Sequence, residues 1–115
     1  MLASSATRAL TTCQLIALEV KYPIEKIEVD SAIYGADVEG LKSTVQNISN
    51  DVKSLAVFGH NPTFHAISNE LHEKNIPRFP TCSMLYVSFN TDEWGKCFKS
   101  ANKSIFFDFP EKISQ

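Results

Sequence analysis

The chain has 115 residues, of which 43% are hydrophobic, and it carries 11 Lys and Arg against 13 Asp and Glu, for a formal net charge of -2. This length and apolar content fit a single domain spanning residues 1–115 with one core. The acidic balance and the short apolar runs argue against nucleic acid and against a membrane as partners.

The first part of the chain alternates short apolar segments with a helical pattern. Met1–Ala3 is short and apolar and fits the end of a strand. A helix is predicted next, with Ser4 or Ser5 as its N-cap. Apolar residues then recur with helical period at Ala6, Leu10, Cys13, Ala17 and Val20. Pro23 ends this helix, and a short strand is predicted over residues 26–29.

The middle of the chain repeats the same order. Asp37 is expected to cap a second helix, whose apolar face comprises Val38, Leu41, Val45 and Ile48. Residues 55–59 form a continuous apolar run ending in glycine, which is typical of a strand buried on both faces. Asn61 and Pro62 are then expected to be the N-cap and first residue of a third helix that reaches about Lys74.

In the C-terminal part of the chain, the side-chain pattern changes to a period of two residues. Leu85, Val87 and Phe89 are expected to face one way, and Met84, Tyr86 and Ser88 the other. Residues 90–93 have turn chemistry, and residues 104–109 fit a last strand before Pro110. The pattern predicts an α/β fold with a mostly parallel sheet, right-handed crossovers and an antiparallel C-terminal edge.

One candidate for chemistry is Arg8, at the first strand-to-helix junction. A cation in the first turn of a helix interacts unfavourably with the helix dipole. An arginine at this position therefore often serves to bind an anion. Its guanidinium can hold an anion through two parallel hydrogen bonds. The alternative is an ordinary solvated surface arginine.

A second candidate is His60, at the junction between the predicted strand 55–59 and the third helix. Gly59 would allow the backbone to approach a ligand closely, and the amides at the start of the helix favour an anion. The alternative is a histidine that only caps or packs at the end of a strand.

The remaining candidates favour structural roles. His65 and His72 are seven residues apart and do not form the i, i+4 pair of a zinc helix. Trp94 and the Phe106-Phe107 pair are expected in the core or at an edge. The three cysteines fit neither a disulfide frame nor a Cys-x-x-Cys pair, which favours a reducing, cytoplasmic location with no metal and no cofactor.

Taken in order, four segments carry a family resemblance. Ser4-Ser5-Ala6-Thr7-Arg8-Ala9-Leu10-Thr11-Thr12 resembles the Ser-x-x-x-Arg-Ala-x-x-Thr signature of the histidine phosphatase superfamily. Val57-Phe58-Gly59-His60-Asn61-Pro62 resembles its second-histidine motif in the form found in the phosphohistidine-phosphatase branch. Ala32-Ile33-Tyr34-Gly35-Ala36 and Phe79-Pro80-Thr81-Cys82-Ser83 are similar to the Leu-Tyr-x-Ala and Pro-Thr-Gly-Ala segments of that branch, and the Trp94 and Phe109-Pro110-Glu111-Lys112 positions also recur.

The resemblance implies a three-layer α/β/α, phosphoglycerate-mutase-like fold and hydrolysis through a phosphohistidine intermediate. His60 would hydrogen-bond the transferred phosphoryl group, Arg8 would grip the same group, and Asn61 would help through its backbone amide. The implied substrate is a phosphorylated protein carrying phosphohistidine, or a small phosphomonoester. A phosphoryl transition state spreads negative charge over three oxygens, which suits fixed positive groups.

The chain departs from the family at its nucleophile. The family's attacking histidine lies in an Arg-His-Gly motif on a first strand, and no Arg-His-Gly occurs in this sequence. We therefore expect an N-terminally truncated, partial domain that has lost its central strand, exposes an unpaired edge, is inactive alone and is marginally stable. The family's general acid would correspond to Glu39 or Asp37.

Two other interpretations stay open. The chain could be a non-catalytic phosphate-binding or interaction module that kept Arg8 and His60 without the nucleophile. It could also be a generic α/β binding domain whose resemblance is accidental.

Overall fold

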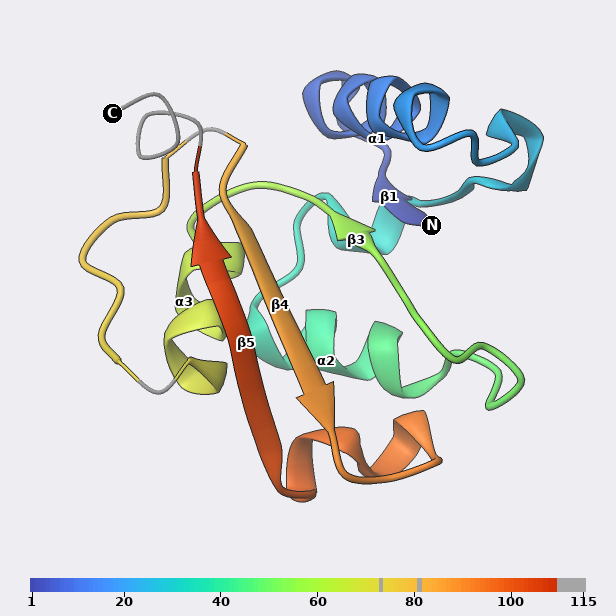
Figure 1. Ribbon diagram of the computed structural model, residues 1–115. Helices are drawn as coiled ribbons and strands as arrows, with labels where there is room; N and C mark the ends of the chain where they lie inside the picture. Colours follow the sequence, from blue (N-terminus) through green and yellow to red (C-terminus); the bar gives the residue numbers. More distant parts are fainter. Residues whose placement is uncertain (73, 81, 110–115) are drawn as a thin grey trace.

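In the computed structural model, which describes residues 1–72, 74–80 and 82–109, the strands fall into two separate sheets. A parallel sheet has the order β2-β1-β3, with β1 (Leu2–Ser4) between β2 (Glu28–Asp30) and β3 (Val57–Phe58). An antiparallel pair consists of β4 (Met84–Phe89) and β5 (Asn102–Asp108) (Figure 1). The predicted α/β fold is confirmed, with parallel strands followed by an antiparallel pair. The pair is a sheet of its own, however, and not an edge of the parallel sheet.

The helices connect the strands in the predicted order. They are α1 (Thr7–Glu19), α2 (Val38–Gln46) and α3 (Thr63–Leu71), with short 3-10 helices η1 (Ile24–Lys26), η2 (Ser31–Ile33) and η3 (Trp94–Lys99). Helix α1 packs against β1 and β3, α2 contacts α3, and α3 contacts β5. Figure 1 shows α1 above the parallel strands and α2 and α3 below them in this view.

Pairing between β1 and β3 decides where the loops meet. The two strands are parallel, with Leu2 opposite Val57 and Ala3 opposite Phe58. The carboxyl ends of neighbouring parallel strands lie at the same edge of a sheet. The turn from β1 into α1 and the turn from β3 into α3 therefore leave the sheet side by side.

The predicted helix caps are partly confirmed. Asp37 caps α2, with its Oδ1 accepting a hydrogen bond from the Gly40 amide at 2.8 Å. The N-cap of α1 is Ala6, without a side-chain cap, so the prediction of Ser4 or Ser5 was wrong. Ser4 is buried at the end of β1, and its hydroxyl instead accepts a hydrogen bond from the Ala6 amide at 3.2 Å.

Helix α3 is shorter than predicted. It begins at Thr63, so Pro62 is its N-cap and not its first residue. Asn61 precedes this cap, across a cis peptide bond. The helix ends at Leu71, before the predicted Lys74, because the chain turns extended at His72.

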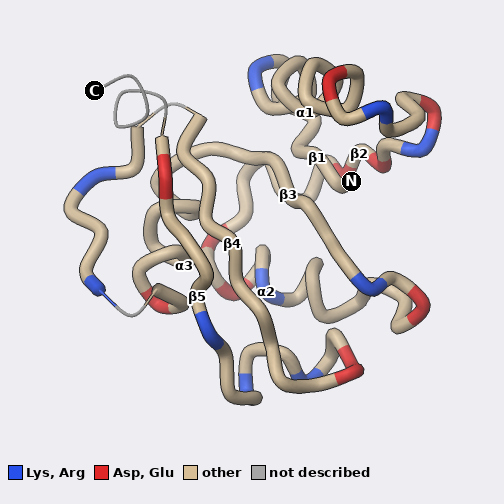
Figure 2. The backbone as a smooth tube through the Cα atoms, in the orientation of Figure 1, with Lys and Arg blue, Asp and Glu red and all other residues tan. Residues whose placement is uncertain are grey.

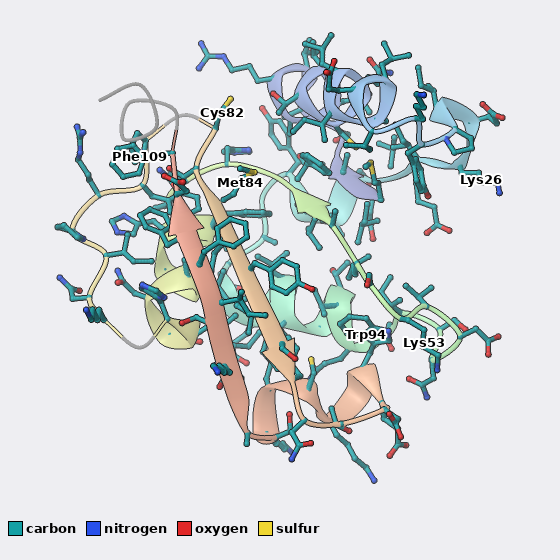
Figure 3. All side chains as sticks on the ribbon, in the orientation of Figure 1. Lys26, Lys53, Cys82, Met84, Trp94 and Phe109 are labelled. Atoms are coloured by element: carbon teal, nitrogen blue, oxygen red, sulfur yellow. The ribbon has the colours of Figure 1, made fainter. Side chains whose placement is uncertain are left out.

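The C-terminal hairpin contains more than a turn. Helix η3 follows the predicted turn, and β5 begins at Asn102, two residues before the predicted start. The indole Nε1 of Trp94 donates to the Val52 carbonyl at 2.9 Å, which ties η3 to the loop before β3 (Figure 3). Along β4, exposed and half-buried residues alternate as predicted.

Thr81 and residues 110–112, which belong to the family resemblance, lie outside the described residues.

The core is small and leaves β3 incompletely covered. Leu2, Ile33, Leu41 and Ile67 form its buried cluster. Val57 and Phe58 are only half-buried, and Ala56 is exposed. The predicted burial of this strand on both faces is therefore wrong in this structure. The physical reason is that, among the described residues, β3 pairs with β1 alone, so its other edge is open.

Charged residues are mixed over the surface. Figure 2 shows Lys and Arg interspersed with Asp and Glu along the helices and loops, while β3 and β4 are free of charge. Among the described residues, no helix has the length and apolar character needed to cross a membrane.

Candidate functional site

Two predicted residues, Arg8 and His60, lie on the loops that leave the parallel sheet side by side. Arg8 is in the first turn of α1, after β1, and His60 follows β3 directly. Both side chains are exposed, and both residues line one large cavity of about 1880 Å³. The topology therefore places both residues at the same end of the sheet, on the wall of a common cavity.

Among the described residues, none compensates the charge of Arg8. The first turn of α1 contains no acidic residue. No described residue forms an ion pair or a hydrogen bond with the Arg8 guanidinium, although its backbone carbonyl accepts from the Thr12 hydroxyl at 2.9 Å. An exposed guanidinium beside the amides of a helix start is suited to an anion.

His60 lies against an aromatic ring that sequence reasoning did not assign to the site. The rings of Tyr34 and His60 are 5.8 Å apart in an edge-to-face arrangement. Both residues also line a second cavity of about 320 Å³, together with Asp37 and Asn61. In the sequence, Tyr34 belongs only to a segment that carries the family resemblance. No local signal could place it here, because it comes from the end of η2 and meets His60 through the tertiary fold.

The side chain of Asn61 joins two segments. Its Nδ2 donates to the Phe79 carbonyl at 2.8 Å, and its Oδ1 accepts from the His65 amide at 3.2 Å. Asn61 therefore fixes the junction after β3 relative to the loop that leads toward β4. The role predicted from the resemblance concerned its backbone amide, which is a separate group.

Gly59 has a packing reason to be glycine. A Cβ atom at this position would overlap the ring of Phe64 on α3. The sequence predicted close approach of the backbone to a ligand, and the structure shows close approach to this ring. The contact positions the peptide that carries His60 against the start of α3.

The two candidate acids differ in position. Asp37 lines the smaller cavity with His60 and caps α2 through Oδ1. Glu39 lines neither cavity, and its carboxylate lies 3.9 Å from the Lys42 ammonium. Lys42 also pairs with Glu70 at 2.7 Å, and this hydrogen bond raises the pKa of Lys42. Of the two carboxylates, only that of Asp37 therefore shares a cavity with His60.

The other histidines have structural partners. The Nε2 atom of His65 lies 2.6 Å from the Ile76 carbonyl, and its ring stacks on Phe79. The Nδ1 atom of His72 lies 2.9 Å from the Ser104 hydroxyl. The described part of the chain contains no cluster of three or more groups that could hold a metal ion.

The cysteines are all free thiols. Cys13 and Cys97 are buried, and burial raises the pKa of both thiols. A raised pKa lowers the fraction of nucleophilic thiolate near neutral pH. Cys82 is exposed and lies in the loop before β4 (Figure 3).

Comparison of the chain with protein-family models, with curated proteins and with solved structures gives no match.

Proposed function

We propose that this chain is a phosphate-binding domain of the histidine phosphatase type, related to phosphohistidine phosphatases, in which Arg8 and His60 hold a phosphoryl group. The observation that carries the proposal is that β1 and β3 are parallel neighbours, so that the loops bearing these two residues leave one end of the sheet. The three-layer, phosphoglycerate-mutase-like fold and a cytoplasmic location are part of the same proposal. The free cysteines fit such a reducing compartment.

The chemistry of the two residues is complementary. Arg8 offers a planar, permanently charged fork that matches two oxygens of a phosphoryl group. His60 can donate a ring N–H to a third oxygen, and its ring packs edge-to-face with the ring of Tyr34. Asp37, on the smaller cavity beside His60, is the better placed of the two candidate acids to protonate a leaving group. The substrate class is protein-borne phosphohistidine or a small phosphomonoester.

A second candidate function is phosphate binding without catalysis. His65 and His72 both have ring nitrogens engaged with structural partners, and no Arg-His-Gly occurs in the sequence. Within these 115 residues, no histidine therefore stands free to act as a nucleophile toward a group bound by Arg8 and His60.

Titration with inorganic phosphate tests the site directly. We expect amide shifts in two-dimensional NMR spectra at residues 5–9 and 59–61, saturating with phosphate. Arg8→Gln and His60→Gln should each weaken binding about tenfold, since a hydrogen bond to a charged group contributes roughly 1.5–3 kcal/mol. Lys103→Gln, which removes an exposed cation from β5, is the matched control. Equal weakening by Lys103→Gln and Arg8→Gln would mean that phosphate is attracted only by net charge, and the proposal would fail.

Hydrolysis by the purified chain provides a second prediction. We expect no turnover of p-nitrophenyl phosphate or of a phosphohistidine peptide above the background rate, because the nucleophile is missing. Rapid turnover that His60→Gln abolishes would show instead that the chain is catalytically complete.

A further inference from the structure

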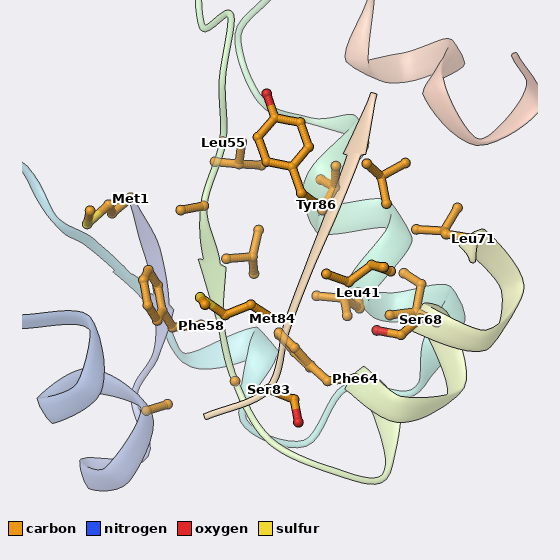
Figure 4. Close-up of a pocket in the computed structure, with 18 of the residues that line it drawn as sticks. Met1, Leu41, Leu55, Phe58, Phe64, Ser68, Leu71, Ser83, Met84 and Tyr86 are labelled. Atoms are coloured by element: carbon orange, nitrogen blue, oxygen red, sulfur yellow. The ribbon is translucent and has the colours of Figure 1, made fainter. Parts of the chain in front are cut away.

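Helix α3 presents two different faces to its surroundings. Figure 4 shows Phe64, Ser68 and Leu71 directed into the large cavity, and all three residues line it. His65 and Asn69 line neither of the two cavities. Residues four apart on a helix lie on the same side, so these two side chains share a face of their own. That face contacts the loop that follows α3 in the chain.

The backbone of Ile76 in this loop is bound by both side chains. Its amide donates to Oδ1 of Asn69 at 2.6 Å, and its carbonyl accepts from Nδ2 of Asn69 at 3.2 Å. Nε2 of His65 lies 2.6 Å from the same carbonyl, and this nitrogen carries a proton because a carbonyl only accepts. Ile76 is 2% exposed, and a buried backbone group without a partner is costly. The position of the loop therefore depends on His65 and Asn69.

At Phe79, three residues after Ile76, the same loop binds Asn61. The Phe79 carbonyl accepts from Nδ2 of Asn61 at 2.8 Å, and the Phe79 ring stacks on that of His65. Oδ1 of Asn61 accepts at 3.2 Å from the amide of His65, the third residue of α3. Three side chains spaced four residues apart thus bind one loop directly. We call these three residues, together with the two loop residues that they bind, the clasp: Asn61, His65, Asn69, Ile76 and Phe79.

His60 lies between two residues that contact α3. On one side, Gly59 packs so closely against the Phe64 ring that a Cβ atom would overlap it. On the other side, Asn61 is bound to the α3 backbone and to the loop. Within the part of the chain that the structure describes, the His60 ring makes no hydrogen bond and contacts the ring of Tyr34. The place of His60 is therefore set mainly by the backbone on either side of it.

We propose that His65 and Asn69 are positioning residues for His60. The clasp fixes Asn61, and Asn61 fixes the backbone that carries His60. Neither His65 nor Asn69 lines a cavity, so their effect on a bound ligand is indirect. Residues 79 and 80 line the large cavity together with His60, so the clasp also holds one wall of that cavity. The proposal rests on the proposed function, since it concerns the same site, but its first test needs no phosphate.

The ring signals of His60 in NMR spectra of the full chain test the link without any ligand. Asn69→Ala removes both hydrogen bonds between Asn69 and Ile76, and it should shift the His60 ring signals. Asn102→Ala is the matched control, because Asn102 also ties α3 to another segment, by donating to the Leu71 carbonyl at 2.9 Å. This control should lower stability but leave the His60 signals unchanged. Unchanged His60 signals in Asn69→Ala, or equal shifts in both variants, would overturn the proposal.

Phosphate binding tests the same link in a second way. Asn69→Ala should weaken binding of inorganic phosphate about threefold to tenfold, the range expected when one hydrogen bond is lost. In a chain that already carries His60→Gln, it should have no further effect, because its effect passes through His60. Equal weakening in both backgrounds would mean that Asn69 acts independently of His60, and the proposal would be wrong. Absence of phosphate binding by the unaltered chain would instead refute the proposed function, and the ring signals would still decide this proposal.

A milder variant serves if Asn69→Ala does not fold. His65→Gln keeps a donor for the Ile76 carbonyl but removes the ring that stacks on Phe79. It should loosen the loop, and so speed hydrogen exchange at the Ile76 amide and shift the His60 ring signals together. Faster exchange at Ile76 without any shift at His60 would show that the clasp holds only the loop, and the proposal would fail.

Discussion

At the scale of single residues, the junction after β3 is held by contacts that exclude larger side chains. Gly59 lies where any Cβ would overlap the Phe64 ring, and Phe64 packs against the core cluster. The position of His60 therefore depends on a packing contact inside the protein, one residue before it. The site and the core share this segment.

Substitution of Gly59 measures that dependence. Gly59→Ala should lower the free energy of unfolding by about 1–3 kcal/mol, because the Phe64 ring must move. Urea denaturation followed by circular dichroism gives the value. Gly35→Ala is the control, since nothing lies within 4 Å of a Cβ there and its φ is not positive. A loss of stability in Gly35→Ala as large as in Gly59→Ala would contradict the packing argument.

The sequence predicts Arg8 and His60 as candidates because each lies at the junction between a strand and a helix. The features that mark these two junctions come from residues that are neighbours in the chain. A basic residue in a first helical turn, and a histidine after Gly59 at the end of an apolar run, are visible in the order of residues. Tyr34 and the bracing role of Asn61 are not visible in this way. Their partners, His60 and Phe79, are brought to them only by the tertiary fold.

At the scale of elements, α1 and α2 differ in the cap and the charge of their first turns. The Asp37 carboxylate caps α2, and its first turn also contains Glu39. Helix α1 starts without a side-chain cap and with Arg8 in its first turn. The first arrangement stabilises a helix and the second does not.

Removal of the α2 cap should have a measurable cost. Asp37→Ala should lower the free energy of unfolding by about 1 kcal/mol, because the Gly40 amide loses its acceptor. Asp51→Ala removes an exposed carboxylate from a turn and should change stability by less than about 0.5 kcal/mol. Thermal unfolding of the two variants side by side tests the difference. Identical shifts would mean that Asp37 acts only through its charge.

The order of elements is predictable from the sequence, and their bounds and pairing are less so. Hydrophobic periodicity predicts the strands and helices, because it reflects which face is buried. The predicted start of α3 was wrong because Asn61 and Pro62 are both residue types that are common at helix starts. The separation of β4 and β5 from the parallel sheet was not predicted, since strand pairing depends on contacts between residues far apart in the chain.

At the scale of the whole molecule, the core is modest for 115 residues. The largest side chains with less than 2% exposure are Cys13, Cys97 and Ser4, while Leu15, Leu18 and Ile105 are more than half exposed. Apolar burial is the main favourable term in folding. A chain that buries few large apolar side chains should be weakly stable.

Equilibrium unfolding tests this expectation. We expect a free energy of unfolding below about 5 kcal/mol, the low end of the usual range for domains. We also expect binding of a hydrophobic dye at neutral pH, because of the exposed apolar residues. A value above about 10 kcal/mol would contradict the argument from core size.

The division into two sheets also determines how the molecule would carry a mechanical load. Residue 1 borders the parallel sheet, and β5 near the other end of the described chain belongs to the antiparallel pair. Tension between these ends passes from one sheet to the other through side chains, such as those that join α3 to β5. Among the described residues, no ladder of backbone hydrogen bonds links the two sheets. In an optical trap the two sheets should therefore part at low force, before either ladder shears.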